Sequence, residues 1–438
     1  MHKIAYAKYK AEQKTRQRDQ LFMSKNHHRN AEAERKSDLS DMRSRTRLFV
    51  SLALVLLTAS ITLAVWRTGI VRVFSGSGDG GVSIFGAGEV APDIIVPQEA
   101  PRETREQKLE RARNARGIYI TQSTVRSKKM EELFTLIKDT ELNAVVIDVK
   151  DGDGVFFDDK LKEWISRLKK EKIWLIARVM VFQDNKLAKD NPKVMLHNKQ
   201  GGLWKNYRGW YWVDPASQEA WKYNLDVVKQ AIDYGFDEVN FDYIRFPSDG
   251  ALSNIVYPFW DGVASKSVVM TSFFKYMDEE VEQYNPDTML SIDVFGYVFL
   301  TKDINIGQDL SMMLPYFDFV CPMVYPSHYY AGNFGFANPA EHPYEVIQKT
   351  FEKQKAFLDE QGAVLKVRPW LQAFDMGAAY DARMVDLEKK AAYDFGLSGW
   401  LLWNARNTYR KSILEPEETD NNTTAIINIQ DNATSSLK

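Results

Sequence analysis

The chain has 438 residues, a formal net charge of −2, 45% apolar residues, 26% charged residues and a single cysteine. This length allows one large barrel or two ordinary domains, and the composition excludes collagen-like, wholly disordered and disulfide-rich classes. The lone Cys321 can form neither an internal disulfide nor a thiolate metal cluster.

The charges are distributed unevenly along the chain. Residues 1–47 hold 13 basic and 6 acidic side chains, whereas the remainder holds 44 basic and 53 acidic side chains. Nucleic-acid binding requires a basic face, so we expect no nucleic-acid partner for this acidic body. The polar composition of residues 1–47 predicts a cytoplasmic tail with little stable structure.

Residues 48–66 form an uncharged stretch of 19 residues, mostly Leu, Val, Ala and Ile. As a helix it would be roughly 28 Å long, close to the ~30 Å hydrocarbon core of a bilayer. The basic excess before it places the amino terminus in the cytoplasm and the following chain outside the membrane. A cleaved signal peptide is the alternative, but its leader is normally short. We therefore predict an uncleaved, single-pass anchor in contact with the lipid bilayer.

The segments on either side of the predicted folded body are polar. Residues 67–115 are expected to form a flexible linker, rich in glycine and proline over 75–101, and then a charged lead-in helix. Residues 415–438 are rich in Asn, Thr, Ser and acids and are expected to be a disordered tail.

Between residues 116 and 414, a run of β-branched and aromatic residues followed by an amphipathic segment repeats eight times. The predicted strands are 117–122, 143–150, 172–181, 238–246, 289–295, 317–325, 366–374 and 399–404. Predicted helices include 127–139, 217–234, 266–284, 344–360 and 381–394. Ser217 is a typical helix-capping residue, and Gly235 and Gly396 are typical helix ends. This rhythm predicts an α/β fold, a (β/α)₈ TIM barrel.

The active site of such a barrel lies at the carboxyl ends of its strands. Several predicted strands end in polar or aromatic side chains that could contact a substrate there. These candidates are Asp148, Lys150, Arg178, Arg245, Tyr325, Trp370, Gln372, Asp375, Trp403 and Asn404.

Asp242 and Asp293 are the strongest catalytic candidates. Each is a carboxylate within an otherwise apolar strand, and the two strands are neighbours. A lone carboxylate there is costly to desolvate, so it must be paired or in use. Two carboxyl groups facing one cavity are what glycoside hydrolysis requires, since one protonates the leaving oxygen while the other attacks or activates water. The alternative is that Asp242 forms a structural ion pair with Arg178 or Lys150.

Aromatic residues crowd the long connection after the third predicted strand. Trp204, Trp210 and Trp212 lie within nine residues of one another. Flat rings suit the apolar faces of sugars, and long insertions at the upper rim of a barrel are often functional. We expect this insertion to form a sugar subsite, although the same rings could simply pack the insertion.

The sequence predicts neither a cofactor nor a metal. No Gly-x-Gly-x-x-Gly motif follows the first predicted strand, so a dinucleotide site has no support. His197, His328 and His342 are far apart and lack zinc-ligand spacing. The missing histidine ligands also argue against a carbohydrate deacetylase.

Five segments near strand ends carry a further signal: 235–247, 291–296, 321–329, 367–374 and 399–404. Over about residues 114–412 the chain resembles a bacterial barrel family of the glycosyl hydrolase type, distantly similar to α-amylase-like barrels. The resemblance implies action on a glycan. In amylase-like barrels the nucleophile ends strand four, the acid/base ends strand five and a third carboxylate follows strand seven. By position these correspond to Asp242, Asp293 and Asp375, and Asn240 stands where amylases keep an arginine.

The sequence therefore predicts a membrane-anchored glycoside hydrolase acting on an extracytoplasmic or cell-surface polysaccharide. Asp242 is expected to be the nucleophile or base and Asp293 the general acid. The alternative is a non-catalytic barrel that binds glycan and tethers it to the membrane.

Overall fold

The computed structural model of the chain describes residues 103–302 and 304–415. The predicted cytoplasmic tail, membrane anchor and spacer before residue 103, and the predicted tail after residue 415, lie outside the described residues. Within the described ranges, none of the helices combines the length and the hydropathy that a bilayer-crossing segment requires.

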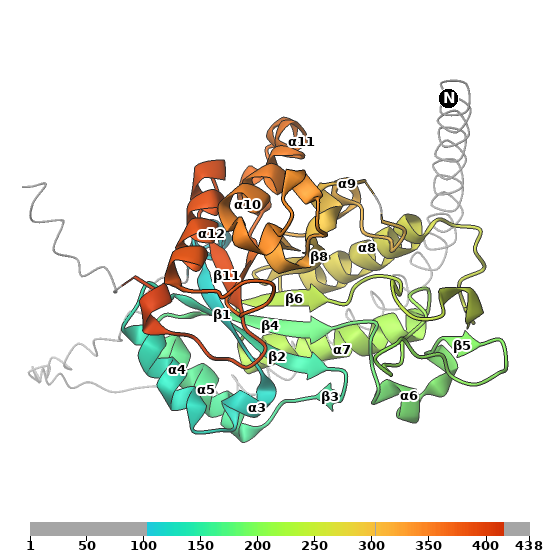
Figure 1. Cartoon of the computed structure of the whole chain (residues 1–438). Coiled ribbons are helices and arrows are strands. Elements are labelled where there is room, and N and C mark those ends of the chain that lie inside the picture. The colour runs from blue at the N-terminus through green and yellow to red at the C-terminus, as the bar shows by residue number, and fades with distance from the viewer. Residues whose placement is uncertain (1–102, 303, 416–438) are drawn as a thin grey trace, which may run out of the picture. The chain divides into compact units, whose positions relative to one another are not determined.

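Within the described residues, eight parallel strands form a closed barrel (Figure 1). In chain order they are β1 (Arg116–Ile120), β2 (Ala144–Asp151), β4 (Trp174–Met180), β6 (Glu238–Asp242), β8 (Met289–Phe295), β9 (Phe319–Met323), β10 (Trp370–Gln372) and β11 (Trp400–Trp403). Each pairs with the next, and β1 pairs with both β2 and β11, which closes the barrel. The predicted (β/α)₈ architecture and all eight predicted strands are confirmed.

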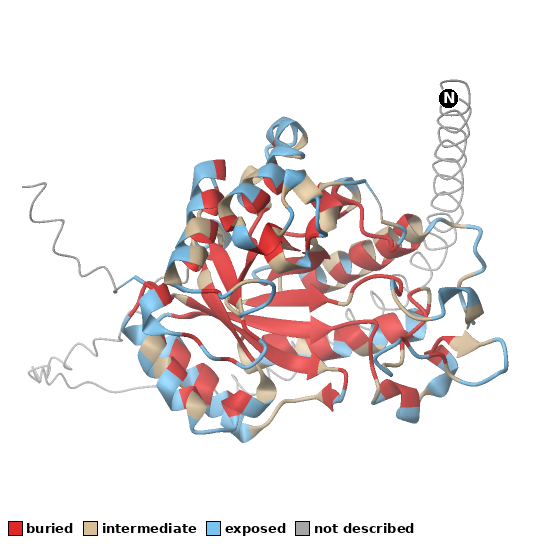
Figure 2. Ribbon diagram, in the orientation of Figure 1, coloured by how far each residue is buried: buried red, intermediate tan, exposed pale blue. Residues whose placement is uncertain are grey.

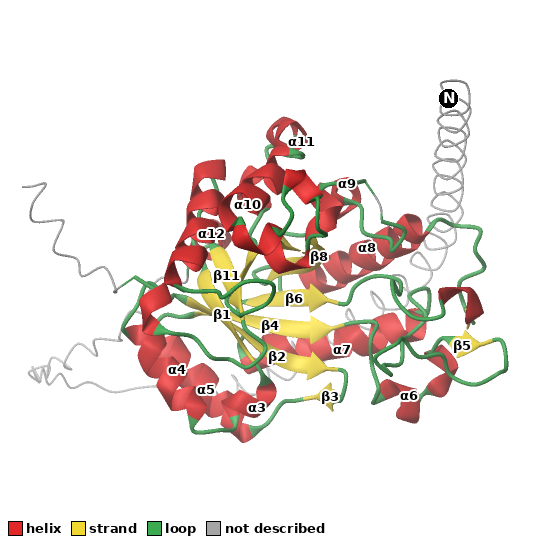
Figure 3. Ribbon diagram, in the orientation of Figure 1, coloured by secondary structure: helices red, strands yellow, loops and turns green. Residues whose placement is uncertain are grey.

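Helices surround the barrel (Figure 3). The longer ones are α4 (Lys129–Lys138), α5 (Asp159–Lys170), α7 (Gln218–Tyr234), α8 (Lys266–Tyr284), α10 (Pro343–Glu352), α11 (Lys355–Glu360) and α12 (Ala382–Phe395). Single-turn helices α3 (Gln122–Val125), α6 (Leu187–Asp190) and α9 (Leu310–Met313) lie in the connections. The segment predicted as one helix over 344–360 is two helices, because the α-helical pattern is interrupted at residues 353–354 between α10 and α11.

The capping predictions are confirmed by the backbone. The Ser217 side chain accepts a hydrogen bond from the backbone N–H of Ala220 at the start of α7. Gly235 and Gly396 end α7 and α12 with φ of 97° and 100°, a left-handed conformation that glycine adopts without steric cost.

The strands are buried on both faces, as Figure 2 shows by their colour. Outward-facing residues such as Val145 and Ile147 pack against the helices, whereas Val146 and Ile176 belong to a second apolar cluster inside the barrel. Helix α2 (Arg105–Arg113) contributes Ala112 to this inner cluster. The lead-in helix predicted before the first strand therefore covers the amino-terminal end of the barrel.

Two long connections build up one side of the opposite, carboxyl-terminal end. The connection after β4 contains β5 (His197–Asn198), and the connection after β6 contains β7 (Ile255–Val256). These two short strands pair antiparallel, so the connections form one insertion beside the barrel mouth (Figure 1). A further short strand, β3 (Gly154–Val155), forms a hairpin with the end of β2.

Candidate functional site

Four charged side chains from neighbouring strands gather inside the carboxyl-terminal end of the barrel. Asp148 on β2 is in register with Arg178 on β4, and β4 places Met180 beside Asp242 at the end of β6. Asp293 follows on β8. All four side chains are buried, with exposed fractions between 2% and 7%. The barrel therefore concentrates one cation and three carboxyl groups in a small volume.

The Arg178 guanidinium lies at the centre of this cluster. Its Nη1 donates to Asp148 Oδ1 at 2.6 Å, and its Nη2 and Nε donate to Asp242 Oδ2 at 2.5 and 3.2 Å. Its Nε also lies 4.0 Å from Asp293 Oδ2. Burial lowers the pKa of Arg178, but the carboxylates of Asp148 and Asp242 outweigh burial and raise it well above its ordinary value. Arg178 is therefore a permanent positive charge shared by three acidic side chains.

Asp293 is held in an environment that favours its protonated form. Its Oδ1 accepts hydrogen bonds from Asn240 Nδ2 at 2.9 Å and from Trp370 Nε1 at 2.7 Å. Burial, and secondarily the nearby charge of Asp242, raise the pKa of Asp293 to about 8. Since both hydrogen-bond donors bind Oδ1, the proton belongs on Oδ2, which lies 4.0 Å from Arg178 Nε.

Asp242 is oriented by the backbone turn that ends β6. Its Oδ1 accepts from the backbone N–H of the next residue, Tyr243, at 2.6 Å. Tyr243 has a φ of 51°, which is unfavourable for a bulky side chain and is tolerated only where the surrounding packing enforces it. This turn explains why the strand predicted over 238–246 ends at Asp242. The carboxyl group is thus fixed by N–H donors on both oxygens.

Asp148 is linked to Tyr119, a residue that was not among the sequence-based candidates. The Tyr119 hydroxyl on β1 donates a short hydrogen bond to Asp148 Oδ2, and the Tyr119 ring stacks on Trp403 with 4.0 Å between ring centroids. Burial raises the pKa of Asp148, although Arg178 and Tyr119 partly offset this effect. The available signal was that Tyr119 has the same inward parity on β1 that Asp148 has on β2.

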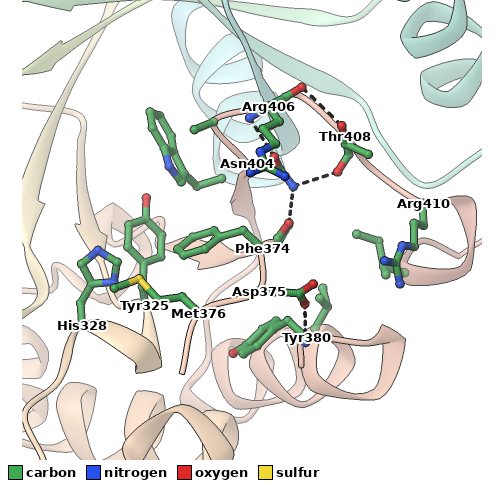
Figure 4. Close-up of a pocket in the computed structure, with 15 residues that line it drawn as sticks. Tyr325, His328, Phe374, Asp375, Met376, Tyr380, Asn404, Arg406, Thr408 and Arg410 are labelled. Atoms are coloured by element: carbon green, nitrogen blue, oxygen red, sulfur yellow. Dashed lines mark hydrogen bonds between the residues drawn. The ribbon is translucent and has the colours of Figure 1, made fainter. Parts of the chain in front are cut away.

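A pocket of about 500 Å³ is lined by residues at and after the ends of β9, β10 and β11 (Figure 4), and none of the four charged residues of the cluster is among them. Tyr325 and Trp403 form the boundary between the pocket and the cluster. The Trp403 ring centroid lies 5.3 Å from the Arg178 guanidinium. Burial, and after it the charges of Asp293 and Asp242, raise the pKa of Tyr325. The remaining lining residues include His328, Phe374, Asp375, Met376, Tyr380, Asn404, Arg406, Thr408 and Arg410.

Three predicted substrate contacts have mainly local partners near this pocket. Gln372 is fully buried, accepts from the Ser327 hydroxyl at 2.8 Å and donates to Phe374 O at 2.9 Å. Asn404 lines the pocket but uses Nδ2 to hold Thr408 O at 2.9 Å. Asp375 is exposed in the pocket, and its Oδ1 accepts from the Tyr380 N–H at 2.7 Å. The fourth, Trp370, is the indole donor to Asp293.

Lys150 lies outside the carboxyl cluster. It is fully buried and forms an ion pair with Asp184 at 2.9 Å, with the Tyr223 ring beside it. A register shift between Asp148 and Lys150 interrupts the alternation of β2. Because of this irregularity, Lys150 does not share the inward direction of Asp148, although the two are separated by one residue.

The aromatic residues of the insertion mostly pack the insertion itself. Trp204 and Trp212 are 2% and 0% exposed. Trp210 lies against the β2–β3 turn so closely that a Cβ on Gly152 would meet its ring at 2.0 Å. Arg245 is buried with its guanidinium 4.8 Å from the centre of the Trp212 ring.

The described residues include no group of three or more His, Cys, Asp or Glu arranged to hold a metal ion.

Comparison with known proteins places this barrel in a family. The model for the "putative glycosyl hydrolase domain" matches residues 117–409, which is well over half of the chain and includes every strand end described above. The chain belongs to this family. The resemblance seen in the sequence is thereby confirmed. A comparison with curated protein sequences gives no match.

Solved structures similar to this family member include glycoside-hydrolase barrels. The PgaB (BpsB) glycoside hydrolase domain from Bordetella bronchiseptica is 16% identical, with a TM-score of 0.50 over 66% of this chain and 94% of that chain. An alpha-galactosidase from Thermus thermophilus is 11% identical, with a TM-score of 0.44 over 70% of this chain and 67% of that chain. A hypothetical protein from Ruminiclostridium thermocellum is 28% identical, with a TM-score of 0.36 over 40% of this chain and 97% of that chain. At 16% identity, the similarity to the PgaB (BpsB) domain supports the fold alone.

Proposed function

We propose that this chain is a glycoside hydrolase that uses Asp242 and Asp293 as its pair of catalytic carboxyl groups. The observation that carries the proposal is the difference between their surroundings. Asp242 receives N–H donors from Arg178 and Tyr243, which suit an anion, whereas burial raises the pKa of Asp293 to about 8. A carboxyl group that holds a proton suits the acid role, and a neighbouring carboxyl group bound by N–H donors suits the nucleophile or base role.

The proposed reaction follows from these states. Protonated Asp293 donates its Oδ2 proton to the glycosidic oxygen as the bond to the sugar breaks. Asp242 either attacks the anomeric carbon or takes a proton from the water that does so. The loss of one proton by Asp293 is compensated by the fixed charge of Arg178, whose Nε lies 4.0 Å from Asp293 Oδ2. Asp148 balances that charge on the other side of the guanidinium.

The aromatic walls of the adjoining pocket supply the proposed contacts to sugar. Trp403 is half-buried and is braced by Tyr119, and Phe374 lies 5.6 Å from Tyr325 between ring centroids. Rings of this kind cover the apolar face of a sugar, and the exposed Asp375 can accept hydrogen bonds from hydroxyl groups. We assign no sugar contact to Lys150, since its partners lie beneath the insertion.

A glycan-binding barrel without hydrolytic activity is the second candidate. It is favoured by the ion pair between Arg178 and Asp242 and by the low exposure of Asp242 and Asp293, 7% and 2%. Such a protein would use the same aromatic pocket. The two candidates differ in a single measurable property, which is bond cleavage.

The deciding experiment is a glycan-hydrolysis screen with the full chain and with Asp242→Asn. Loss of a catalytic carboxylate is expected to lower turnover by about 10²- to 10⁴-fold with glycan binding retained. Asp318→Asn is the matched control, because Asp318 lies at the start of β9 and its ion pair with Arg105 is outside the site. Retained turnover in Asp242→Asn would remove this residue from catalysis. Binding without cleavage of any glycan by the unmodified chain would favour the binding barrel.

We also propose that the barrel acts outside the cytoplasm, on an extracellular or cell-surface polysaccharide, anchored in the bilayer by residues 48–66. The support is the sequence of this segment and the basic excess before it. External protease on intact cells should cleave the barrel while sparing a cytoplasmic marker. Protection of the barrel until the cells are lysed would reverse the proposed topology.

A further inference from the structure

The wall of the pocket formed by residues 404–411 is basic. It contains Arg406, Arg410 and Lys411 and no acidic residue. Arg406 and Arg410 line the pocket and are exposed to solvent. No carboxylate of the described residues lies within ion-pair distance of either guanidinium, whereas Lys411 is paired with Asp139 at 3.0 Å. Two arginine side chains therefore line the pocket without an ion pair to any of the described residues.

The loop that carries these arginines is rigidly built. Asn407 is fully buried, has a φ of 51° and donates from Nδ2 to Tyr119 O at 2.9 Å. The Tyr409 hydroxyl donates to the same carbonyl at 2.8 Å, and Asn404 Nδ2 donates to Thr408 O at 2.9 Å. The loop is thus fastened to β1 at Tyr119, the residue whose hydroxyl holds Asp148. A preorganised loop loses little conformational freedom when a ligand binds to its arginines.

The rest of the pocket suits a sugar ring with one charged substituent. Figure 4 shows Asp375 and Tyr380 between the rings of Tyr325 and His328 on one side and the guanidinium of Arg410 on the other. Asp375 is the one acidic residue among those lining this pocket, and its Oδ1 is already bound to a backbone N–H. The aromatic side includes Trp403, whose ring centroid lies 5.3 Å from the Arg178 guanidinium.

We propose that this pocket is a subsite for an anionic sugar residue, whose acidic group is bound by Arg406 and Arg410 while its ring lies against the aromatic wall. The planar guanidinium matches the geometry of carboxylate and phosphate oxygens, and such charge-assisted hydrogen bonds are stronger than neutral ones. This inference deepens the proposed function, on which it rests for the nature of the substrate as a glycan. It names that substrate as acidic.

A third arginine on the insertion supports this assignment. Arg208 is exposed, and its charge contributes, after burial, to lowering the pKa of His328, a residue of the pocket. The charge of Arg208 also partly offsets the rise that burial causes in the pKa of Tyr243, the residue after β6. The tip of the insertion therefore adds positive potential at the barrel mouth, although the body as a whole is acidic. Positive charge at the rim of this pocket attracts anionic ligands.

The test is the binding of the full chain to matched pairs of acidic and neutral oligosaccharides. One arm compares oligogalacturonates with their methyl esters, and a second compares mannose 6-phosphate oligosaccharides with the dephosphorylated forms. A third arm is a glycan array containing other uronate, phosphate and sulfate sugars with neutral counterparts. Each is measured with the unmodified chain and with Arg406→Gln/Arg410→Gln. The control is Lys349→Gln/Lys353→Gln, which removes the same charge from exposed positions at the outer helix α10.

We expect the acidic member of at least one pair to bind about tenfold or more tightly than its neutral partner, and the arginine double variant to remove that preference. The control variant should keep it, and added salt should weaken it. Equal binding of acidic and neutral members, binding of neutral glycans only, absence of binding throughout the panel, or a preference that survives the double variant would overturn the proposal. Acidic glycans that bind but are not cleaved would contradict hydrolysis while leaving the subsite intact.

Discussion

The two ends of the barrel interior both contain a buried arginine, but the two arginines have different ion-pair partners. At the amino-terminal end, Arg368 on the segment before β10 pairs with Glu238, whose Oε2 also accepts from Trp174 Nε1 at 2.9 Å. Arg368 Nη1 further donates to Ala112 O on α2 at 3.1 Å. At the carboxyl-terminal end, Arg178 is shared by Asp148, Asp242 and Asp293.

The difference lies in the balance of charge and in access to solvent. One guanidinium and one carboxylate compensate each other at the amino-terminal end, where α2 covers the barrel. At the other end, one guanidinium faces three carboxyl groups, and burial together with the charge of Asp242 raises the pKa of Asp293 to about 8, so that Asp293 holds a proton at neutral pH. A buried ion pair can serve structure, whereas an excess of carboxyl groups beside a pocket is poised for proton transfer.

The sharpest way to break this comparison is Asp293→Asn. An amide keeps the oxygen that accepts from Asn240 and Trp370 but carries no transferable proton, so hydrolysis is expected to fall by about 10²- to 10⁴-fold with the fold intact. In the unmodified chain, activity should fall as pH rises through about 8, where Asp293 loses its proton. Initial rates between pH 5 and 10 measure both effects. An alkaline limb that persists in a residually active Asp293→Asn variant would assign the titration to another group.

The same residue links pH to folding. Between its ordinary pKa of 3.8 and about 8, Asp293 is protonated in the folded chain but ionised in the unfolded chain. Its contribution to stability is therefore complete below about pH 4 and is lost as pH rises through about 8. Urea unfolding at pH 5 and pH 8 should reveal a smaller loss of stability in Asp293→Asn than in the unmodified chain. An equal loss in both would contradict the assignment.

Glu238→Gln tests the opposite end. It leaves the Arg368 guanidinium buried without its countercharge, which is expected to lower the free energy of unfolding by about 3–5 kcal/mol. Asp318→Asn, which weakens a partly exposed ion pair with Arg105, should cost about 0–1 kcal/mol. Denaturant titration gives both values. A stable Glu238→Gln protein with impaired turnover would mean that the amino-terminal pair also serves catalysis.

Tyr119→Phe should have a smaller effect than Asp293→Asn or Glu238→Gln. It removes the hydroxyl that donates to Asp148 but keeps the ring that stacks on Trp403. We expect a loss of about 1 kcal/mol in stability and less than tenfold in kcat/KM, because Arg178 still binds Asp148. Thermal unfolding and steady-state kinetics provide the readouts. A loss of turnover as large as that of Asp242→Asn would place Tyr119 in proton transfer.

The alternation of apolar runs and amphipathic segments was sufficient to predict the barrel. Strands buried on both faces give strong runs of β-branched residues, and Ser217, Gly235 and Gly396 marked helix ends correctly. Strand ends were less accurate, because they depend on tertiary constraints such as the strained turn at Tyr243. The membrane anchor at residues 48–66 stays a prediction.

The carboxyl cluster could be predicted from the sequence for a geometric reason. In a barrel, charged residues of like parity near the ends of adjacent strands converge, which brought Asp148, Arg178, Asp242 and Asp293 together. Side-chain contacts that depend on irregular backbone could not be predicted from the sequence. The shift after Asp148 redirects Lys150. The burial of Trp204, Trp212 and Arg245 depends on pairing between two connections that are distant in sequence. Arg406 and Arg410 were overlooked because they follow the last strand on a loop without a recognisable motif.

The way α2 meets the barrel determines where a soluble fragment can begin. The family match starts at residue 117, yet Ala112 and Ala115 are completely buried and belong to the inner cluster. A truncation at the family boundary would therefore admit water to the Glu238 and Arg368 pair. The shortest self-contained domain starts one residue before α2, at the Thr104 cap, whose hydroxyl and backbone N–H exchange hydrogen bonds with Gln107. A fragment that keeps this cap retains α2, which covers the amino-terminal end of the barrel but lies outside the family match.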